Sequence, residues 1–222
     1  IICAKYLMTG DGETVLEGQA VLTGGDGKIK KIAPKEELVQ DFPEEEVKDY
    51  GEATLLPGLC DMHVHLAYWY SQPDSFNYNE QMITLYALQH AQAAFERGIT
   101  SVRDMSSYHG VCRSLKLAQE KGFITIPRIT HTDTGMCMTG GHACDEVPEV
   151  DGPWEVRKEI RKQVRDGAEW VKILTTHRSH IPEFTQEELN AAVDECHRRG
   201  IKCGVHAGTN PGIQMCIDAG FD

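Results

Sequence analysis

The chain has 222 residues, of which 41% are hydrophobic, and its formal net charge at pH 7 is −12. This length suits one large domain or a small and a medium one, and the negative charge argues against nucleic acid or an anionic membrane as a partner and favours a small-molecule substrate. No apolar stretch approaches the roughly 20 residues of a membrane helix, and the eight cysteines contain no CxxC pair, so we expect a soluble cytoplasmic protein with reduced thiols.

The first 54 residues have the pattern of a small β region. Short apolar pieces alternate with the turn sequences GDGE at residues 10–13 and GGDGK at residues 24–28, and with a charged stretch at residues 44–46. Glycine, aspartate and closely spaced charges favour turns, so the pattern predicts hairpins rather than helices. We therefore assign residues 1–54 to a small β domain and residues 55–222 to a second domain.

From residue 55 onward, apolar strands alternate with amphipathic segments of helical period, which is the pattern of βα units on a parallel sheet. The predicted strands cover residues 55–61, 100–104, 126–131, 170–175 and 201–206. The predicted helices lie near residues 80–97, 111–121, 153–166, 186–199 and 211–219. The fourth of these helices opens with Thr185 as its N-cap and has Glu188 at the capping-box position.

This alternation predicts an α/β fold with two candidate architectures. An open doubly wound sheet is less favoured, because the chain has neither a GxGxxG nor a GxxxxGK[ST] loop. A complete eight-unit barrel typically needs about 250 residues, which is more than the second domain offers. We therefore predict a (β/α)8 TIM-like barrel truncated to about five βα units, whose open edges favour a homo-oligomer.

The sequence LLPGLCDMHVHL at residues 55–66 places His63 and His65 at the end of a predicted strand. Residues i and i+2 of a strand point to the same side, so both imidazoles would project together and form half of a metal site. This order of strand, turn and ligand pair resembles the first barrel strand of the amidohydrolase superfamily. The resemblance implies that residues 1–54 correspond to the small β-sandwich that precedes the barrel in that superfamily, here incomplete.

Two further residues extend the predicted metal site. Lys172 lies in the apolar sequence WVKILTT, where an ammonium group is costly to bury unless it is paired, modified, directed into a polar cavity or extended to solvent. His206 ends its predicted strand, at the edge where barrel enzymes build their sites. The segments DGAEWVKI and 183–222 resemble the fourth and fifth barrel strands of amidohydrolases. The resemblance implies that Lys172 is carboxylated by carbon dioxide and that His206 is a metal ligand.

Contacts to the substrate are predicted mainly in the loops. His142 lies in the glycine-rich sequence MTGGHA, where an imidazole can stabilise an oxyanion or hold a substrate carboxylate. TGGH resembles the substrate-contacting loop of the prolidase-like and dipeptidase branch, so His142 is our candidate catalytic residue. Arg178 is a second candidate ligand for a carboxylate. Tyr68 and His131 are candidates for substrate binding by their positions after predicted strands.

For several other polar residues near strand ends, the sequence leaves two possible roles. His177 and His180 flank Arg178 and could reach the edge of the metal site or lie in a solvated loop. Many relatives carry a glycine-rich turn at this point, so the chain departs from the pattern of the superfamily here. Asp61 and Asp104 end predicted strands, where each could orient a ligand histidine or cap the following turn.

The resemblance implies a metal-dependent hydrolase with two divalent ions, and zinc is the default because nitrogen and oxygen donors suit it. The ions would lower the pKa of a shared water, and the resulting hydroxide would attack the amide or peptide C–N bond of a dipeptide or an N-acyl amino acid. Their implied ligands are His63, His65, Lys172 and His206. The superfamily also implies a histidine after the sixth strand and an aspartate after the eighth. Neither maps onto these 222 residues, so we expect this chain alone to be inactive.

Two other functions are compatible with the same residues. A single-metal relative of imidazolonepropionase would hydrolyse a cyclic amide, but such a site does not need the bridging Lys172. A non-catalytic scaffold with an amidohydrolase fold, like the dihydropyrimidinase-related proteins, has no reason to retain a complete ligand set, whereas every ligand position that this chain reaches is filled. The number of bound metal ions would separate these hypotheses.

Overall fold

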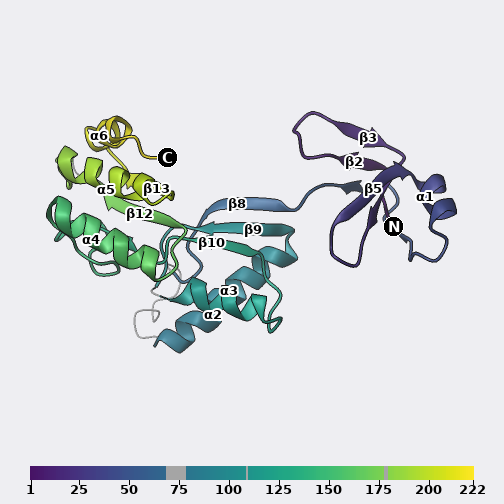
Figure 1. Ribbon diagram of the computed structural model, residues 1–222, viewed down its shortest axis with the longest axis horizontal. Coiled ribbons are helices and arrows are strands. Elements are labelled where there is room, and N and C mark those ends of the chain that lie inside the picture. The colour runs from purple at the N-terminus through teal and green to yellow at the C-terminus, as the bar shows by residue number, and fades with distance from the viewer. Residues whose placement is uncertain (69–78, 109, 178–179) are drawn as a thin grey trace. The chain divides into compact units, whose positions relative to one another are not determined.

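Figure 1 shows the computed structural model, which describes residues 1–68, 79–108, 110–177 and 180–222. Two compact units divide the chain, one over Ile1–Gly58 and the other over Leu59–Asp222. The predicted carboxylate ligand Arg178 lies outside the described residues.

Two small sheets build the first unit, all of whose residues are described. One sheet has the strand order β5-β4-β1-β6 and the other the order β3-β2-β7. Their bounds are β1 Ile2–Cys3, β2 Tyr6–Met8, β3 Val15–Glu17, β4 Gln19–Thr23, β5 Ile29–Pro34, β6 Lys48–Asp49 and β7 Thr54–Leu55. Neighbouring strands pair antiparallel except for β1 with β6 and β2 with β7, which are parallel. The buried core of this unit consists of Ile1, Cys3, Ala20, Leu22, Ala33 and Leu38.

The first unit also contains a helix, α1, which covers Lys35–Asp41. The turn and charge pattern predicted hairpins rather than helices here. The antiparallel pairs β2–β3 and β4–β5 confirm the hairpins, whereas the expectation of no helix was wrong. Leu38 is fully buried in the core, and Glu36 and Glu37 lie in the first turn, where the helix dipole favours acidic side chains. One buried leucine among good helix formers is therefore enough to specify a short helix that packs against the sheet.

The second unit is an α/β structure with parallel strands, as predicted. In its described part, one sheet has the order β10-β9-β8 and another the order β11-β12-β13, and every pairing is parallel. The strands are β8 Leu59–Val64, β9 Ile99–Asp104, β10 Arg128–His131, β11 Gly135–Met136, β12 Trp170–Thr175 and β13 Lys202–Ala207. The N–H of Glu169 donates to the carbonyl of His131 over 2.9 Å, which connects the end of β10 to the start of β12.

Helices follow the strands of this unit and cover the sheets. They are α2 Glu80–Glu96, α3 Val111–Glu120, α4 Gly152–Arg165, α5 Gln186–Arg198 and α6 Gly212–Ala219. Figure 1 shows α2 and α3 beside β9 and β10, and α4, α5 and α6 beside β12 and β13. The predicted capping box of α5 is confirmed, because the side chains of Thr185 and Glu188 each accept the other's backbone N–H. Among the described helices, none combines the length and the apolar character needed to cross a membrane.

The strand predicted over residues 55–61 is two separate strands. β7 pairs with β2 in the first unit, whereas β8 belongs to the second unit and pairs with β9. The prediction was wrong because Pro57, which lacks an N–H, and Gly58 interrupt the strand hydrogen bonds between β7 and β8. β8 begins after them and includes His63, so the candidate ligand pair still lies at the C-terminal end of a strand.

Two large apolar clusters, and a smaller one of Cys137, Val147 and Leu174, form the core of the described part of the second unit. One includes Val102 of β9 and Ile129 of β10 and packs under α2 and α3. The other includes Val171 of β12 and Leu189 of α5 and packs under α4, α5 and α6. These apolar contacts fix the strands from the helical side, which leaves their C-terminal ends to carry polar side chains.

Candidate active site

Six of the predicted site residues line one cavity of about 180 Å³ in the second unit. They are His63, His65, Tyr68, His142, Lys172 and His206. They come from β8, β12 and β13 and from the loops that follow the strands. Parallel strands end at a common edge, so residues far apart in the sequence meet there. The structure therefore brings all four predicted metal ligands together with the candidate catalytic residue His142.

The imidazole of His65 is held in a defined orientation. Its Nδ1 lies 2.8 Å from the carbonyl oxygen of Ser106. A carbonyl can only accept a hydrogen bond, so Nδ1 carries the hydrogen and Nε2 keeps its lone pair. The ring of His63 lies beside it, with 5.2 Å between the ring centroids. Burial lowers the pKa of both histidines, which favours the neutral rings that a metal ion requires.

The end of β9 anchors the segment that carries His65. The N–H of Met105 donates to the carbonyl of Val64 over 2.9 Å, and the N–H of Leu66 donates to Oδ2 of Asp104 over 2.7 Å. Ser106 has a φ of 119°, a conformation that is strained for a residue with a side chain. Its Oγ accepts the N–H of Gly135 over 3.0 Å, which holds the strained turn in place. The strained backbone thus serves to aim one carbonyl at a candidate ligand.

Lys172 lies in the middle of β12 and only 2% of its surface is exposed. Its partners in register on the two neighbouring strands are Gly135 and Gly204, neither of which has a side chain. Burial, and then the nearby Arg103 guanidinium, lower the pKa of the lysine to about 8. Among the described residues we find no hydrogen bond or salt bridge to its ammonium group. A buried lysine without a compensating partner is a candidate for modification.

A larger cavity of about 380 Å³ also borders His63 and Lys172. Arg103 lines it, with its guanidinium 4.1 Å from the centroid of the Trp170 ring and its Nε donating to the carbonyl of Met62 over 2.8 Å. This cavity contains neither His65 nor His206 among its lining residues. We therefore place the candidate site in the smaller cavity, where the imidazoles converge.

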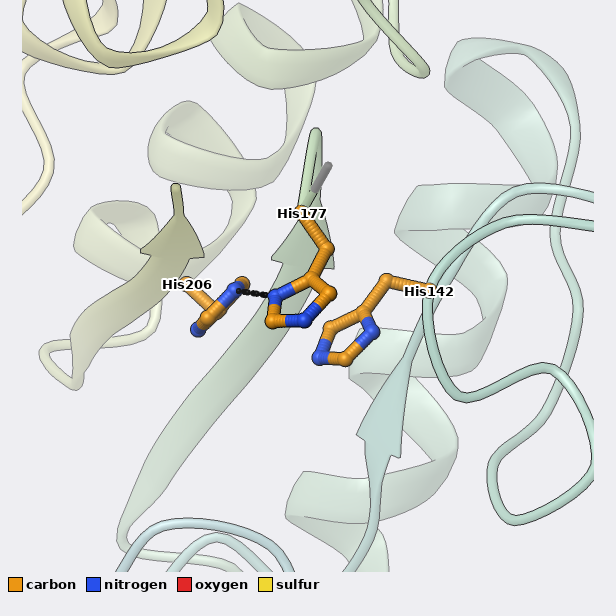
Figure 2. Close-up of side chains that lie close together, drawn as sticks. All are labelled: His142, His177 and His206. Carbon is orange, nitrogen blue, oxygen red and sulfur yellow. Dashed lines mark hydrogen bonds between the residues drawn. The ribbon is translucent and has the colours of Figure 1, made fainter. Parts of the chain in front are cut away.

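Three imidazoles from the loops after β11 and β12 and from β13 gather at the candidate site. Figure 2 shows the rings of His142, His177 and His206, one candidate ligand atom of each lying within 4.8 Å of the others. Nδ1 of His177 lies 2.8 Å from Nε2 of His206, so one of these nitrogens donates to the other. Burial, and then the neighbouring His142, lower the pKa of His206 to about 4.

The stacking of two of these rings limits what the cluster can bind. The rings of His142 and His177 lie 4.1 Å apart and their planes differ by only 9°. The lone pair of an imidazole nitrogen lies in the plane of its ring, and two parallel planes do not meet at a common ion. A metal ion shared by all three rings would therefore require one ring to turn. The arrangement instead suits a group of hydrogen-bonding imidazoles that includes the candidate ligand His206.

Two histidines considered from the sequence lie away from this cavity. His131 ends β10 and is almost fully buried, and it lines a different cavity together with Arg113 and Lys116 of α3. Its Nδ1 accepts the N–H of Asp133 over 3.1 Å. Because the side chains of a strand alternate between its two faces, a position at the strand end does not decide which face a residue takes. His180 is exposed, with Nδ1 3.4 Å from the carbonyl of Asn210.

The structure adds residues to the site that sequence reasoning did not single out. Ser106 and Glu146 line the cavity, and Glu183 accepts hydrogen bonds from the backbone of two of the site loops. Asp104, which was an open assignment, holds the backbone after the ligand pair. Only Glu146 had a local signal, because it belongs to the acidic run around residues 145–151 that follows the TGGH sequence.

The chain is similar to characterised proteins along nearly its whole length. It is 27% identical over 259 residues to ochratoxinase from Aspergillus niger, an alignment that covers 99% of this chain and 52% of the relative. The chain therefore spans about half the length of the curated relatives that it matches.

Solved structures share the fold. A Xaa-Pro dipeptidase with bound methionine in its active site superposes with a TM-score of 0.82 and 29% identity, over 100% of this chain and 59% of the other. The Aspergillus niger ochratoxinase structure gives a TM-score of 0.80 at 23% identity, over 99% of this chain and 57% of the other, which is a likeness of fold. The amidohydrolase family matches residues 54–222, which include every predicted ligand. The chain belongs to the amidohydrolase family.

Proposed function

We propose that the protein carrying this chain is a metal-dependent hydrolase that cuts an amide or peptide C–N bond in a dipeptide or an N-acyl amino acid. The observation that carries this proposal is the convergence of His63, His65, Lys172 and His206 on one cavity with His142. The likeness to a Xaa-Pro dipeptidase at 29% identity favours a peptide bond as the substrate. Because these residues span about half the length of the relatives, we assign the activity to the whole protein and expect these 222 residues alone to be inactive.

The residues of the cavity fit a site for two divalent ions. His63, His65 and His206 are favoured in their neutral forms, and Nε2 of His65 has a free lone pair. Imidazole nitrogens and carboxylate oxygens are ligands that zinc accepts, so zinc is the ion we propose. Bound there, the ions would lower the pKa of a water molecule and polarise the substrate carbonyl.

Lys172 would supply the carboxylate that bridges the ions. Its lowered pKa of about 8 raises the fraction of neutral amine at neutral pH relative to an ordinary lysine, and among the described residues no carboxylate pairs with the ammonium form. Carbon dioxide would add to this amine, forming a bond from Nζ to its carbon while Nζ loses one proton. The product is an anion on a side chain that is 2% exposed, and such a buried charge requires cationic partners. The fit of Lys172 therefore depends on its modification.

The remaining residues would hold the substrate. His142 would donate a hydrogen bond to the substrate carboxylate or to the oxyanion that develops at the scissile carbonyl. Tyr68 lines the same cavity, with its ring 5.7 Å from that of His65. Arg178 stays a predicted carboxylate ligand. His131, which faces α3, is placed outside this cavity.

For the architecture, we propose that the second unit forms the first five βα units of a (β/α)8 barrel. The support is the run of parallel strands and the convergence of polar residues at the C-terminal strand ends. In the described residues a helix is the next element after each strand except β10, which is followed by the short strand β11. The first unit, with its two small sheets, would form part of a β-sandwich.

The test is metal analysis combined with a substrate screen on the intact protein. We expect about two zinc ions per chain and hydrolysis of some dipeptides or N-acyl amino acids, with loss of both on chelation. One metal ion per chain and turnover of a cyclic amide would favour the imidazolonepropionase-like alternative. Stoichiometric metal without turnover of either class, or no bound metal, would contradict the proposed function.

A further inference from the structure

One carboxylate connects two loops of the candidate site. Oε2 of Glu183 accepts the backbone N–H of His142 over 2.9 Å, and Oε1 accepts the backbone N–H of His177 over 3.3 Å. The first loop follows β11 and the second follows β12, so the contact joins segments that are far apart in the sequence. The backbone N–H of Glu183 in turn lies 3.4 Å from Oγ1 of Thr176, which ties Glu183 to the end of β12.

The two amides that Glu183 accepts belong to the two histidines whose rings stack. Fixing both backbone positions limits how far apart the rings can lie, and in the structure the rings stack at 4.1 Å with their planes 9° apart. The ring of His177 is then placed to share a hydrogen with His206 over 2.8 Å, as the dashed line in Figure 2 shows. A single side chain therefore holds the backbone of two of these three histidines, and the third, His206, is reached through the ring of His177.

The glycine before His142 allows the carboxylate to approach. A Cβ atom on Gly141 would lie 2.9 Å from Oε2 of Glu183 and 2.9 Å from Cγ of Met138. Real Cβ contacts are longer than this, so any larger residue would push the carboxylate away from the loop. This gives a physical reason for the second glycine of the TGGH sequence, independent of any contact between that glycine and a substrate.

We propose that Glu183 is a positioning residue that holds His142 and His177 stacked beside His206. Both of its carboxylate oxygens accept backbone amides, so we assign it no role at the reacting atoms. A charge-assisted bond to each loop is stronger than a bond between neutral groups, which suits a contact that fixes two loops at once. The catalytic consequence, though not the positioning itself, rests on the proposed hydrolase function.

The test compares two isosteric substitutions in the intact protein, Glu183→Gln and Glu149→Gln. Oε1 of Glu149 accepts the N–H of Gly140 over 2.7 Å, so it holds the same loop but contacts no amide of a site histidine. In E183Q, the new side-chain amide would present an NH₂ group to one of the two backbone donors, so one loop should be released. In ¹⁵N-histidine NMR of the metal-free protein, we expect E183Q to shift the His142, His177 and His206 signals and E149Q to leave them in place.

With active enzyme, we expect E183Q to raise KM about 10- to 100-fold, with a smaller change in kcat. Removing a group that orients a metal ligand typically lowers affinity or activity by about the same factor. Glu183→Asp keeps the charge but shortens the side chain, so it should also shift the imidazole signals and raise KM. Circular dichroism verifies that each variant is folded. Histidine spectra of E183Q that match those of E149Q, or full rescue by aspartate, would overturn the positioning role.

The NMR measurement separates this proposal from the proposed function, because it needs neither metal nor substrate. Shifted imidazole signals in E183Q, together with no hydrolysis by the unsubstituted protein, would support the role of Glu183 and contradict the hydrolase assignment. A raised KM with unchanged imidazole signals would overturn the positioning role and leave the hydrolase assignment standing.

Discussion

The two sides of the candidate site hold their imidazoles in different ways. On the side of β8 and β9, the ring of His65 is fixed by the backbone carbonyl of Ser106 at a strand end. On the side of β11 and β12, the rings of His142 and His177 depend on loops that share the carboxylate of Glu183. Both contacts join residues 41 positions apart, but the first is made by a backbone carbonyl at the end of paired strands, whereas the second is made by a side chain between two loops. The first should therefore tolerate changes elsewhere better than the second.

The largest effect is expected at Lys172, which lies between the two sides. Lys172→Met keeps most of the length of the side chain but removes the amine that would carry the bridging carboxylate. We expect loss of at least one metal ion per chain and a fall in kcat/KM of roughly a thousandfold, equivalent to about 4 kcal/mol of transition-state stabilisation. Metal analysis and steady-state kinetics on the intact protein measure both.

The matched control for this change is Lys116→Met. Lys116 forms a salt bridge of 2.6 Å to Glu169 on the helical side of the sheet and takes no part in the site. Its substitution should leave metal content and kcat/KM unchanged within about twofold, because such a salt bridge contributes little. If K172M kept two metal ions and its activity, Lys172 would be ruled out as a bridging ligand shared by the two sides.

The next effect concerns only the side of the site at the ends of β8 and β9. Ser106→Val places a β-branched residue at a φ of 119°, which should force the turn to move the carbonyl that orients His65. We expect metal affinity to fall about 10- to 100-fold, as when a group that orients a ligand is lost. Ser106→Gly, like Ser106→Val, loses the Oγ that accepts the N–H of Gly135, but it accepts this φ without strain, so its affinity should stay closer to the original than that of Ser106→Val.

Isothermal titration with zinc distinguishes these outcomes. Equal affinities for S106V and S106G would mean that the strained turn does not set the orientation of His65. The contrast between a side fixed by strand ends and a side fixed by loops would then have no energetic basis.

A smaller effect tests the placement of His131. His131→Leu leaves the buried N–H of Asp133 without its acceptor, so we expect a loss of about 1–3 kcal/mol in the free energy of unfolding. Because this ring faces α3 and not the cavity, KM and kcat should change less than about twofold at temperatures where the variant is folded. Urea unfolding and kinetics measure the two separately. A large rise in KM with little change in stability would place His131 at the substrate after all.

The elements that sequence predicted best are those specified by neighbouring residues. β12 covers residues 170–175 as predicted, because a run of buried apolar side chains admits few other structures. The capping box at Thr185 was equally local. The strand predicted over residues 55–61 is wrong because Pro57 and Gly58 divide the apolar run into two strands that pair in different sheets.

The parts of the site that sequence could not predict depend on geometry across the fold. The HVH sequence was enough to predict that the side chains of His63 and His65 point to the same side and lie at a strand end. The face taken by His131 required the register of β10, and the contact from Glu183 to two loops required knowing that those loops lie side by side. No local pattern marks a carboxylate that accepts backbone amides from distant segments.

The last expected effect, similar in size to that of His131→Leu, concerns the stability of the two sides at low pH. Glu195, on α5, is 3% exposed and accepts hydrogen bonds from Arg161 of α4, with both N···O distances at 2.9 Å, and from Arg199 over 2.7 Å. The bonds from Arg161 are the main cause that lowers the pKa of Glu195 to about 2. These bonds join the two helices that cover β12 and β13, so they stabilise the half of the unit that carries Lys172 and His206.

The sign of the pH dependence follows from this lowered pKa. The folded value lies below the unfolded value of about 4.3, so the stability from Glu195 is fully present above the unfolded value and is lost as pH falls toward 2. Glu195→Gln should cost about 1–3 kcal/mol at pH 7, and this difference should shrink between about pH 5 and pH 2. Glu187→Gln, on an exposed position of the same helix, is the control. As the pH is lowered, the rate of amide hydrogen exchange should rise in α4 and α5 before it rises in α2 and α3. Equal exchange rates in the two helix pairs would contradict the expected difference in stability between the two sides.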